Sequence, residues 1–433
     1  MRVTTAVRPR WTSSSTVWHT PVLGILACAT VALAPMEGYL FAVHGQLAKV
    51  APALLAVAWV VIRVRERRVP RAHPVHAVLA LFAVVLLASA AVHTGGQFTM
   101  DYTVRWLPFL LLTVIIADLA ARELPIRLLL GAAAAGATAA AGTALYAMFA
   151  QGLPRASGPV EDPNDLSYFL VVAVPMLIAA LPSGRHTPPT YLSGQTFLSG
   201  QSTAIGLRVV AALAGATLVA GAMATLSRGG FLALSAAVGW LLLRRVLPLR
   251  VFAGALAVIA LIGASAMSLA GPALAKAFGE KSFIAGSNVD ARELRWQAAA
   301  RMLAENPVLG VGPGGFRSEY AAASHNAEIG EQTPVAHNMY LEVAAELGLP
   351  GFVLFLALLV LATVATERVL RASRHRRPMV AVQAALIAVV VASTFLSQQY
   401  YLPLWLLIGL AVAAESRLHE RRGSADAGAP CDQ

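Results

Sequence analysis

Long apolar runs recur along almost the whole chain, and they constrain its fold more than any other feature. The 433 residues are 58% hydrophobic and only 13% charged, with a mean hydropathy of +0.67. A helix needs roughly 20 apolar residues to cross the hydrocarbon core of a bilayer, and many of these runs approach that length. They are rich in Ala, Leu and Val and lack the polar–apolar alternation of an outer-membrane barrel strand. The sequence therefore predicts an all-α polytopic membrane protein.

The apolar runs predict about twelve membrane-spanning helices. The first run follows Arg2, Arg8 and Arg10, as in a signal peptide, but no convincing cleavage site precedes a soluble domain, so we expect an uncleaved first span. The last two runs are short and could instead form a bent hairpin. By residue number, the expected spans are 20–36, 45–62, 74–93, 103–121, 128–150, 165–182, 208–226, 229–247, 250–270, 338–364, 379–397 and 402–415.

The distribution of basic residues predicts the orientation. With the N-terminus in the cytoplasm, 23 of the 33 basic residues fall on the cytoplasmic side, and six of the other ten lie in the long loop 271–337, which the positive-inside rule exempts. We therefore expect a multi-pass protein of the cytoplasmic (inner) membrane with both termini inside. The expected division is a cytoplasmic tail at 1–19, nine helices within 20–270, a large extracytoplasmic loop at 271–337, three helices within 338–415 and a cytoplasmic tail at 416–433.

Charge and cysteine content exclude two other classes of protein. The net charge of +11 comes from arginines clustered between apolar runs, which is typical of orientation signals and argues against a nucleic-acid partner. The two cysteines, Cys28 and Cys431, provide neither a disulfide framework nor a metal cluster. The histidines are scattered and do not pair with acidic residues, so we expect no metal and no cofactor.

The segment from Arg292 to Gly351 is mostly polar or glycine-rich and interrupts the apolar runs. We expect it to form a roof over the membrane domain and to carry the chemistry. Arg292 and Arg295 precede Trp296 in a stretch, 289–304, whose apolar spacing suits an amphipathic helix. The two arginines could form a solvated charged face, or a fork that clamps a diphosphate, which lysine would not reproduce.

Arg228 stands between two apolar runs, in the sequence ATLSRGGFLALS. An unpaired guanidinium is costly inside the bilayer, so this residue either snorkels at a helix end or meets an anion. The predicted topology puts it on the outer side, where the helix 229–247 presents an N-terminus suited to phosphate. A phosphate-bearing lipid substrate would account for both features.

His337 and Asn338 open the next expected helix. A neutral imidazole at the membrane surface can take a proton from a hydroxyl group at physiological pH, although a lone histidine can equally be structural. Glu342 and Glu346 follow at helical spacing and would be expensive facing lipid, so we expect them to face the protein interior or a wet cavity.

The sequence GVGPGGF at 310–316 matches the dinucleotide pattern G-x-G-x-x-G, but no βαβ unit surrounds it. We expect a tight turn that lets the backbone approach a ligand or pack on helix ends, with Gly312 and Gly314 as candidate binding residues. Asp162-Pro163-Asn164-Asp165 begins another helix, with Arg155 just before it. Asn164 and Arg155 are candidates for the same outer site, although such residues usually only cap a helix.

Taken together, these motifs resemble the O-antigen ligase and polymerase superfamily. The resemblance rests on SRGG at 227–230, R-x-x-x-W from Arg292 to Trp296, NPVLGVGPGGF at 306–316, and His337-Asn338 followed by Gly348 and Gly351. It covers residues from about 155 to 355, while the N-terminal part matches only in hydropathy.

The resemblance implies a metal-independent glycosyltransferase of the GT-C-like type. Such enzymes transfer a glycan from undecaprenyl diphosphate to an acceptor hydroxyl on the outer face of the cytoplasmic membrane. By this resemblance, Arg228 and Arg292 would hold the diphosphate, Arg295 would be a possible substitute for Arg292, and His337 would activate the acceptor. Arg155, Asn164, Asn338, Gly312 and Gly314 complete the expected binding residues. The expected partners are the lipid-linked glycan, a glycan or lipid acceptor, and membrane lipid.

Several activities remain open at this level. Ligation to a lipid acceptor, polymerisation of repeat units and transfer to protein would share these motifs. A small-solute transporter would place its functional polar groups near the membrane midplane, whereas the candidates here gather at one face. A purely structural scaffold would not explain the costly arginine or the glycine-dense loop.

Overall fold

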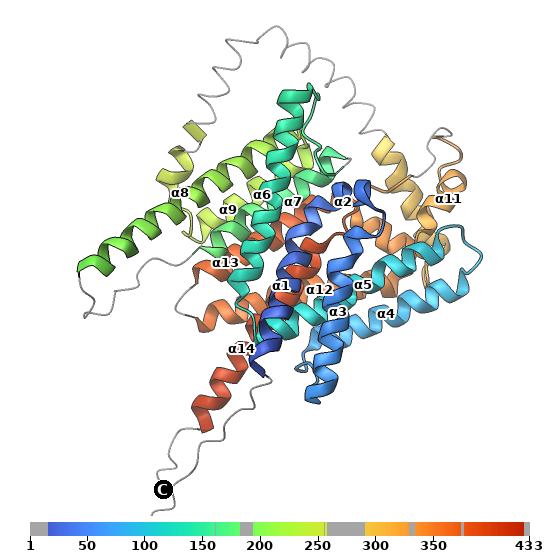
Figure 1. Ribbon diagram of the computed structural model, residues 1–433. Helices are drawn as coiled ribbons and strands as arrows, with labels where there is room; N and C mark the ends of the chain where they lie inside the picture. Colours follow the sequence, from blue (N-terminus) through green and yellow to red (C-terminus); the bar gives the residue numbers. More distant parts are fainter. Residues whose placement is uncertain are drawn as a thin grey trace, which may run out of the picture.

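The structure, a computed structural model, describes residues 16–160, 162–181, 194–254, 256–257, 291–328, 334–373 and 376–427. Within these ranges the regular secondary structure is helical, without a strand. The helices are α1 Thr16–Leu33, η1 Ala34–Met36, α2 Glu37–Val43, α3 Leu47–Glu66, α4 Pro74–Val92, α5 Thr99–Arg122, α6 Ile126–Gln151, α7 Pro163–Ala180, α8 Gly194–Ala224, α9 Arg228–Leu243, α11 Gly315–Ala323, α12 Met339–Ala372, α13 Arg377–Ala392 and α14 Leu402–Ala427 (Figure 1). Residues 291–305 form a further helix.

The predicted all-α polytopic architecture is confirmed. In the described part of the chain, nine helices are long and apolar enough to cross a membrane, and α9 and α13 are shorter apolar helices. Eleven of the twelve expected spans correspond to one of these helices. The remaining expected span, 250–270, lies largely outside the described residues. The last two expected spans are two separate helices, α13 and α14, and α14 is longer than the expected 402–415.

Helices α5, α7 and α14 form the centre of the bundle. α14 packs on α5, α7 packs on α13, and α12 bridges α4 and α14. Trp106 of α5, Phe355 of α12 and Trp405 of α14 stack edge to face in this core, with ring centroids 6.0 to 6.5 Å apart. By contrast, only 22% of the spanning window is buried in α3 and in the described part of α8. These outer helices leave apolar side chains for lipid to cover.

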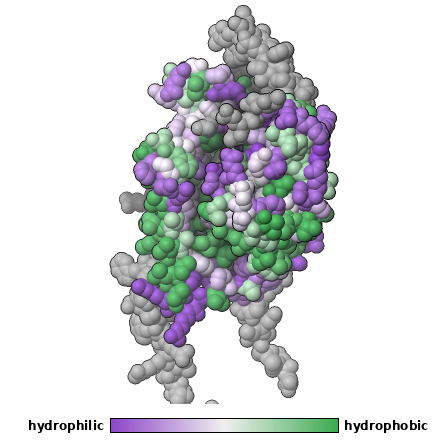
Figure 2. All heavy atoms as spheres, turned by 90° about the vertical axis from the view of Figure 1, so that its right-hand side faces the viewer, coloured by the Kyte–Doolittle hydropathy of each residue, from purple (hydrophilic) through white to green (hydrophobic). Residues whose placement is uncertain are grey.

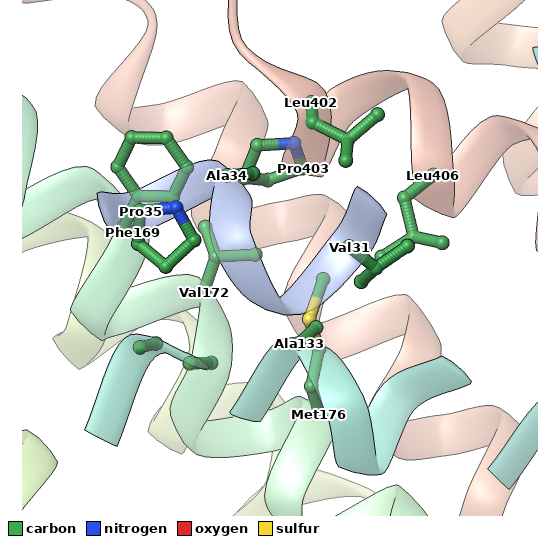
Figure 3. A pocket seen from close by; sticks show the side chains of 12 residues that line it. Val31, Ala34, Pro35, Ala133, Phe169, Val172, Met176, Leu402, Pro403 and Leu406 are labelled. Carbon is green, nitrogen blue, oxygen red and sulfur yellow. The ribbon is translucent and has the colours of Figure 1, made fainter. Parts of the chain in front are cut away.

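Small residues allow close helix packing, as is usual in membranes. A side chain on Gly136 of α6 would meet the Ala32 carbonyl oxygen of α1 at 1.9 Å, and one on Gly409 of α14 would meet the Thr113 carbonyl oxygen of α5 at 3.0 Å. The bundle also contains a small apolar pocket of about 20 Å³ between α1, η1, α6, α7 and α14, lined by Val31, Pro35, Met176 and Leu406 among others (Figure 3). It has room for about one water but no polar lining to hold it, so it carries no candidate site.

Helix α12 is broken once, at Gly348, where φ is 67° and ψ is −172°. The first part, 339–347, is short, and the rest continues to Ala372. The segment 291–328 together with 334–337, which we call the roof, packs on this short first part. The roof has its own small core, in which Met302, Phe316 and Tyr320 meet Ala345 of the short helix. We call the end of the bundle that carries the roof the roof face. Figure 1 shows its gold and orange segments beside the ends of α4 and α5.

The opposite face of the bundle is rich in arginines that are paired. Arg63 contacts Asp118 at 2.6 Å and Glu123 at 2.5 Å. Arg244 contacts Glu367 at 2.8 Å, and Glu415 binds both Arg368 and His73. These arginines therefore have carboxylate partners within the protein.

Candidate functional site

Helix α9 begins at Arg228, and the sequence Ser-Arg-Gly-Gly explains this start. The Ser227 hydroxyl caps the helix by accepting a hydrogen bond from the Gly230 amide at 3.3 Å. A side chain on Gly230 would fall 1.9 Å from Ser167 Oγ of α7, and one on Gly229 would fall 3.0 Å from Phe395 Cβ. The glycines thus let the helix end approach its neighbours, while Arg228 stays exposed at the predicted helix N-terminus.

The helix 291–305 confirms the expected amphipathic helix and separates the two arginines of the fork. Arg295 forms a two-pronged ion pair with Glu328, at 3.0 and 3.1 Å, and its side chain is 9% exposed. Arg295 therefore has a structural carboxylate partner inside the roof. Arg292 is half-buried and has no ion-pair partner among the described residues. Burial lowers the pKa of Arg292, and Asp162 opposes the further lowering by the nearby cations Arg295 and Arg228.

Trp296 connects this helix to the predicted histidine. Its indole Nε1 donates to the Ala336 carbonyl at 3.0 Å. The amide of the same residue, Ala336, donates to Glu342 at 3.1 Å, and the Met339 amide donates to the carbonyls of Ser393 and Leu396. Between these fixed points His337 adopts a left-handed backbone, with φ 49°. A non-glycine residue in this region is strained, which is frequent at functional sites.

The His337 side chain is left without a hydrogen-bond partner from the described residues. Burial lowers its pKa to about 4, assisted by the charges of Arg292 and Arg295, while Asp162 and Glu342 act in the opposite direction. The imidazole is therefore neutral at physiological pH. It has a free nitrogen lone pair with which to accept a proton.

Arg228 and His337 lie at the same end of the bundle. The loop 393–401 joins them, because Phe395 packs on Gly229 while Ser393 and Leu396 accept from Met339. The other end of α9 lies at the opposite face of the bundle, because Arg244 there pairs with Glu367 near the C-terminal end of α12. Arg292 belongs to the same group of side chains, because Arg228 lowers the pKa of Arg292 and Arg292 lowers the pKa of His337. We call Arg228, Arg292 and His337 the cation–histidine cluster.

The acidic helix start contributes one carboxylate to this cluster. Asp162 caps α7 by accepting from the Asn164 amide at 2.8 Å, and it also accepts from the Asn164 side chain at 2.9 Å. Arg155 donates to the Thr225 carbonyl at 2.8 Å and to Asn164 at 3.3 Å. Burial lowers the pKa of Arg155, against the charge of Asp162. Arg155 and Asn164 thus lie beside the cluster but are tied to the ends of α7 and α8. Asn338 similarly caps α12 through its Oδ1, which leaves its amide NH₂ available.

The glycine-rich turn lies elsewhere. Gly312 and Gly314 have φ values of 93° and 74°, and side chains there would collide with His93 and Tyr102. The amides of Val311 and Gly312 donate to the carbonyls of Ala345 and Glu346 at 2.9 and 3.0 Å. The turn therefore packs on the C-terminal end of the short helix 339–347. His337 precedes the other end, roughly 13 Å away at about 1.5 Å per residue. Gly312 and Gly314 are not brought together with the cluster.

Sequence reasoning missed a buried ionic group next to this turn. Arg317 contacts Glu342 at 3.1 Å and Glu346 at 3.4 Å, and its guanidinium lies 4.2 Å from the ring centroid of Tyr102. Both glutamates are fully buried, which confirms that they face the interior. Burial alone would lower the pKa of Arg317, but the two carboxylates outweigh it and raise that pKa. Two glutamates one turn apart in an apolar helix require a counter-charge, and this was the available signal.

A groove of about 550 Å³ is lined mainly by residues of α12 that follow the break at Gly348. Tyr340 also lines it, and the Tyr340 hydroxyl donates to the Val390 carbonyl of α13 at 2.9 Å. The other lining residues are apolar except for one threonine: Phe352, Leu356, Leu359, Val360, Thr363, Val364 and Val390. Figure 2 shows hydrophilic residues concentrated in the upper part of the face it views and hydrophobic residues below them.

No group of three or more histidine, cysteine, aspartate or glutamate side chains that could hold a metal ion occurs among the residues whose placement is described. The site is thus built from arginines, one neutral histidine and carboxylates at one end of a helical membrane bundle. This arrangement defines an integral membrane protein with a cluster of cationic side chains at one of its faces.

The comparison with protein families agrees with the motifs. Residues 213–356, about a third of the chain, match the family model described as O-antigen ligase. This segment is similar to the O-antigen ligase superfamily, and the similarity supports an activity of the O-antigen ligase or polymerase type, that of a glycosyltransferase-like enzyme with lipid-linked glycan substrates. The matched segment contains Arg228, Arg292, Arg295 and His337, whereas Arg155 and Asn164 lie outside it. No curated protein matches the chain.

Proposed function

We propose that this protein transfers a glycan from undecaprenyl diphosphate to an acceptor hydroxyl at the extracytoplasmic face of the cytoplasmic membrane. The observation that carries the proposal is the charge balance of the roof face. Arg228 and Arg292 lie together without a carboxylate ion-pair partner among the described residues, whereas arginines of the opposite face are paired. An anion of the substrate would supply the missing negative charge.

The diphosphate binds between Arg228 and Arg292 in this proposal. Arg228 is the first residue of α9, so the partial positive charge of the helix N-terminus adds to its guanidinium. As the glycosidic C1–O bond to phosphate breaks, negative charge grows on the leaving diphosphate. Two guanidinium groups in a partly desolvated site stabilise that charge directly, and no metal ion is required for this step.

His337 accepts the proton of the acceptor hydroxyl. The hydroxyl oxygen forms the new bond to C1, the diphosphate leaves with the bonding electrons, and the proton passes to the free imidazole nitrogen. A pKa of about 4 makes His337 a weak base while the site is empty. Bound diphosphate offsets the charges of Arg292 and Arg295, and this raises the pKa of His337 toward its ordinary value. Binding of the diphosphate thereby makes His337 a stronger base.

The groove beside Tyr340 suits the isoprenoid chain of the donor. One of its lining residues, Tyr340, is three residues from His337, and the lining is almost wholly apolar. In this proposal the lipid-linked diphosphate places its head group at the cluster while its chain lies along α12 and α13.

The proposed orientation puts the roof face outside and the arginine-rich opposite face in the cytoplasm. Clusters of arginine between spans favour the cytoplasmic side. The proposed division of the chain keeps the cytoplasmic tails 1–19 and 416–433 and the extracytoplasmic loop 271–337. Two single-cysteine variants, Arg301→Cys and Arg371→Cys, test this orientation. A thiol reagent that does not cross the membrane, added to intact cells, is expected to label only the cysteine at position 301.

Ligation and polymerisation require the same donor chemistry and differ in the acceptor. The deciding experiment incubates the purified protein with an undecaprenyl-diphosphate glycan, with and without a lipid acceptor and with and without a chelator. Free undecaprenyl diphosphate with a glycosylated lipid means a ligase, and lengthened chains without the acceptor mean a polymerase. We propose the ligase, with the polymerase of lipid-linked repeat units as the alternative. Absence of glycan transfer in all arms, with folded protein, would contradict the proposal.

A further inference from the structure

The buried carboxylate of Glu342 receives four hydrogen bonds from three separate parts of the chain. Its Oε1 accepts from Arg317 Nη1 at 3.1 Å and from Gln399 Nε2 at 2.9 Å. Its Oε2 accepts from the Ala336 amide at 3.1 Å and from the Ser397 hydroxyl. Glu342 is fully buried, so none of these donors is replaced by water. A carboxylate suits this position because its two oxygens can accept all four hydrogen bonds.

One of the four donors is the backbone amide of Ala336, the residue directly before His337. The Ala336 amide is held by Glu342, and the Ala336 carbonyl is held by Trp296 at 3.0 Å. The left-handed conformation of His337 is unfavourable for an L-residue, so it persists only where neighbouring contacts determine it. The two hydrogen bonds at Ala336 are such contacts.

We infer that Glu342 is a positioning residue for glycan transfer: its carboxylate fixes the backbone before His337 and so presents the imidazole to the diphosphate site. This inference rests on the proposed function. Arg317 contacts this carboxylate at 3.1 Å, its own side chain is only 7% exposed, and its guanidinium lies over the ring of Tyr102. Glu346 shares Arg317 but forms no hydrogen bond to residues 334–338 among those described.

Glu342→Gln tests the inference with a nearly isosteric side chain. A glutamine has only one acceptor oxygen, so its NH₂ group must face one of the two donor pairs that the carboxylate satisfied. We expect kcat to fall about 100-fold, as for a misplacement of a catalytic group by roughly 1 Å. The KM for the lipid-linked donor should stay within about threefold, because the arginines that bind diphosphate are not altered.

Glu346→Gln is the matched control. It makes the same chemical change one helical turn later, in the other carboxylate that contacts Arg317. Its kcat is expected to stay within about threefold of the wild type, because the Ala336 amide keeps Glu342 as its acceptor. Equal loss of kcat in both variants would mean that the buried ionic group acts only on stability, and this would overturn the inference.

A parallel His337→Ala variant separates this inference from the proposed function. If His337→Ala retains transfer, the proposed mechanism fails. If His337→Ala is inactive while Glu342→Gln matches the wild type, only the positioning role fails. Trp296→Phe removes the hydrogen bond on the other side of Ala336 and decides the question if Glu342→Gln does not fold. We expect it to lower kcat about tenfold without changing donor KM, and an unchanged kcat would contradict the positioning role.

Discussion

The indole of Trp296 donates a hydrogen bond to the carbonyl of Ala336 at 3.0 Å, so the roof helix directly holds the residue that precedes His337. Arg292 lies four residues before Trp296, one turn away on the same helix. The spacing R-x-x-x-W thus has a structural meaning. One residue anchors the helix to the histidine segment, and the other extends a cation toward the same place.

Removing either cation of the cluster should abolish turnover without unfolding the protein. We expect Arg228→Ala and Arg292→Ala each to lower glycan transfer at least about 100-fold, because each removes a group that stabilises charge on the leaving diphosphate. Lysine at either position should restore little, since it lacks the planar fork of guanidinium. The measurement is release of undecaprenyl diphosphate by purified protein. Arg371→Ala, whose side chain is 78% exposed on the opposite face, should behave like the wild type. Wild-type turnover of Arg228→Ala would exclude it from the site.

The lowered pKa of His337 should make stability depend on pH. The pKa is about 4 in the folded protein, below the ordinary value of 6.5. Between these values the unfolded chain binds a proton that the folded protein does not, so stability is present above pH 6.5 and is lost as the pH falls toward about 4. Between about pH 7 and about pH 5, the melting temperature of the wild type should therefore fall more than that of His337→Gln. An identical fall in melting temperature for both proteins would show that the pKa of His337 is not lowered in the folded protein.

Arg295 should contribute to stability of the roof through its pairing with Glu328. Breaking a largely buried ion pair at one partner costs about 3 kcal/mol, so Arg295→Ala should unfold the roof more readily. A double-mutant cycle with Glu328→Gln, read by hydrogen exchange in residues 291–328, measures the coupling. Additive effects of the two substitutions would show that the pair contributes nothing. Arg301→Ala, in the same helix, is the comparison at a site without a carboxylate partner among the described residues.

The glycine-rich turn should be sensitive to a single methyl group. Gly312→Ala forces an L-residue into φ 93° and places its Cβ 2.8 Å from that of His93, so we expect a loss of about 2 kcal/mol or more. Gly142→Ala lies in α6 with open space around it and should be neutral or stabilising by up to about 1 kcal/mol. Thermal unfolding of both variants in detergent provides the measurement. A neutral Gly312→Ala would mean that the turn is not packed as described.

Hydropathy predicted the helices well because apolar length is a local property of the sequence. It did not predict the break at Gly348, since that glycine depends on contact with the distant carbonyl of Pro307, which accepts from the Leu349 amide at 2.8 Å. Arg228 could be chosen as a site candidate from the sequence, because it is a single cation between two apolar runs. The partners of Arg295 and Arg317 could not be assigned, because they depend on the path of the roof and not on spacing.

The positive φ of His337 sets two requirements on one residue. The backbone there favours glycine, whereas the proposed proton transfer needs an imidazole. His337→Gly should therefore relieve local strain of about 1 kcal/mol while removing the base. A selection for thermal tolerance alone would favour glycine at this position, so variants improved in stability need to be screened for turnover at the same time.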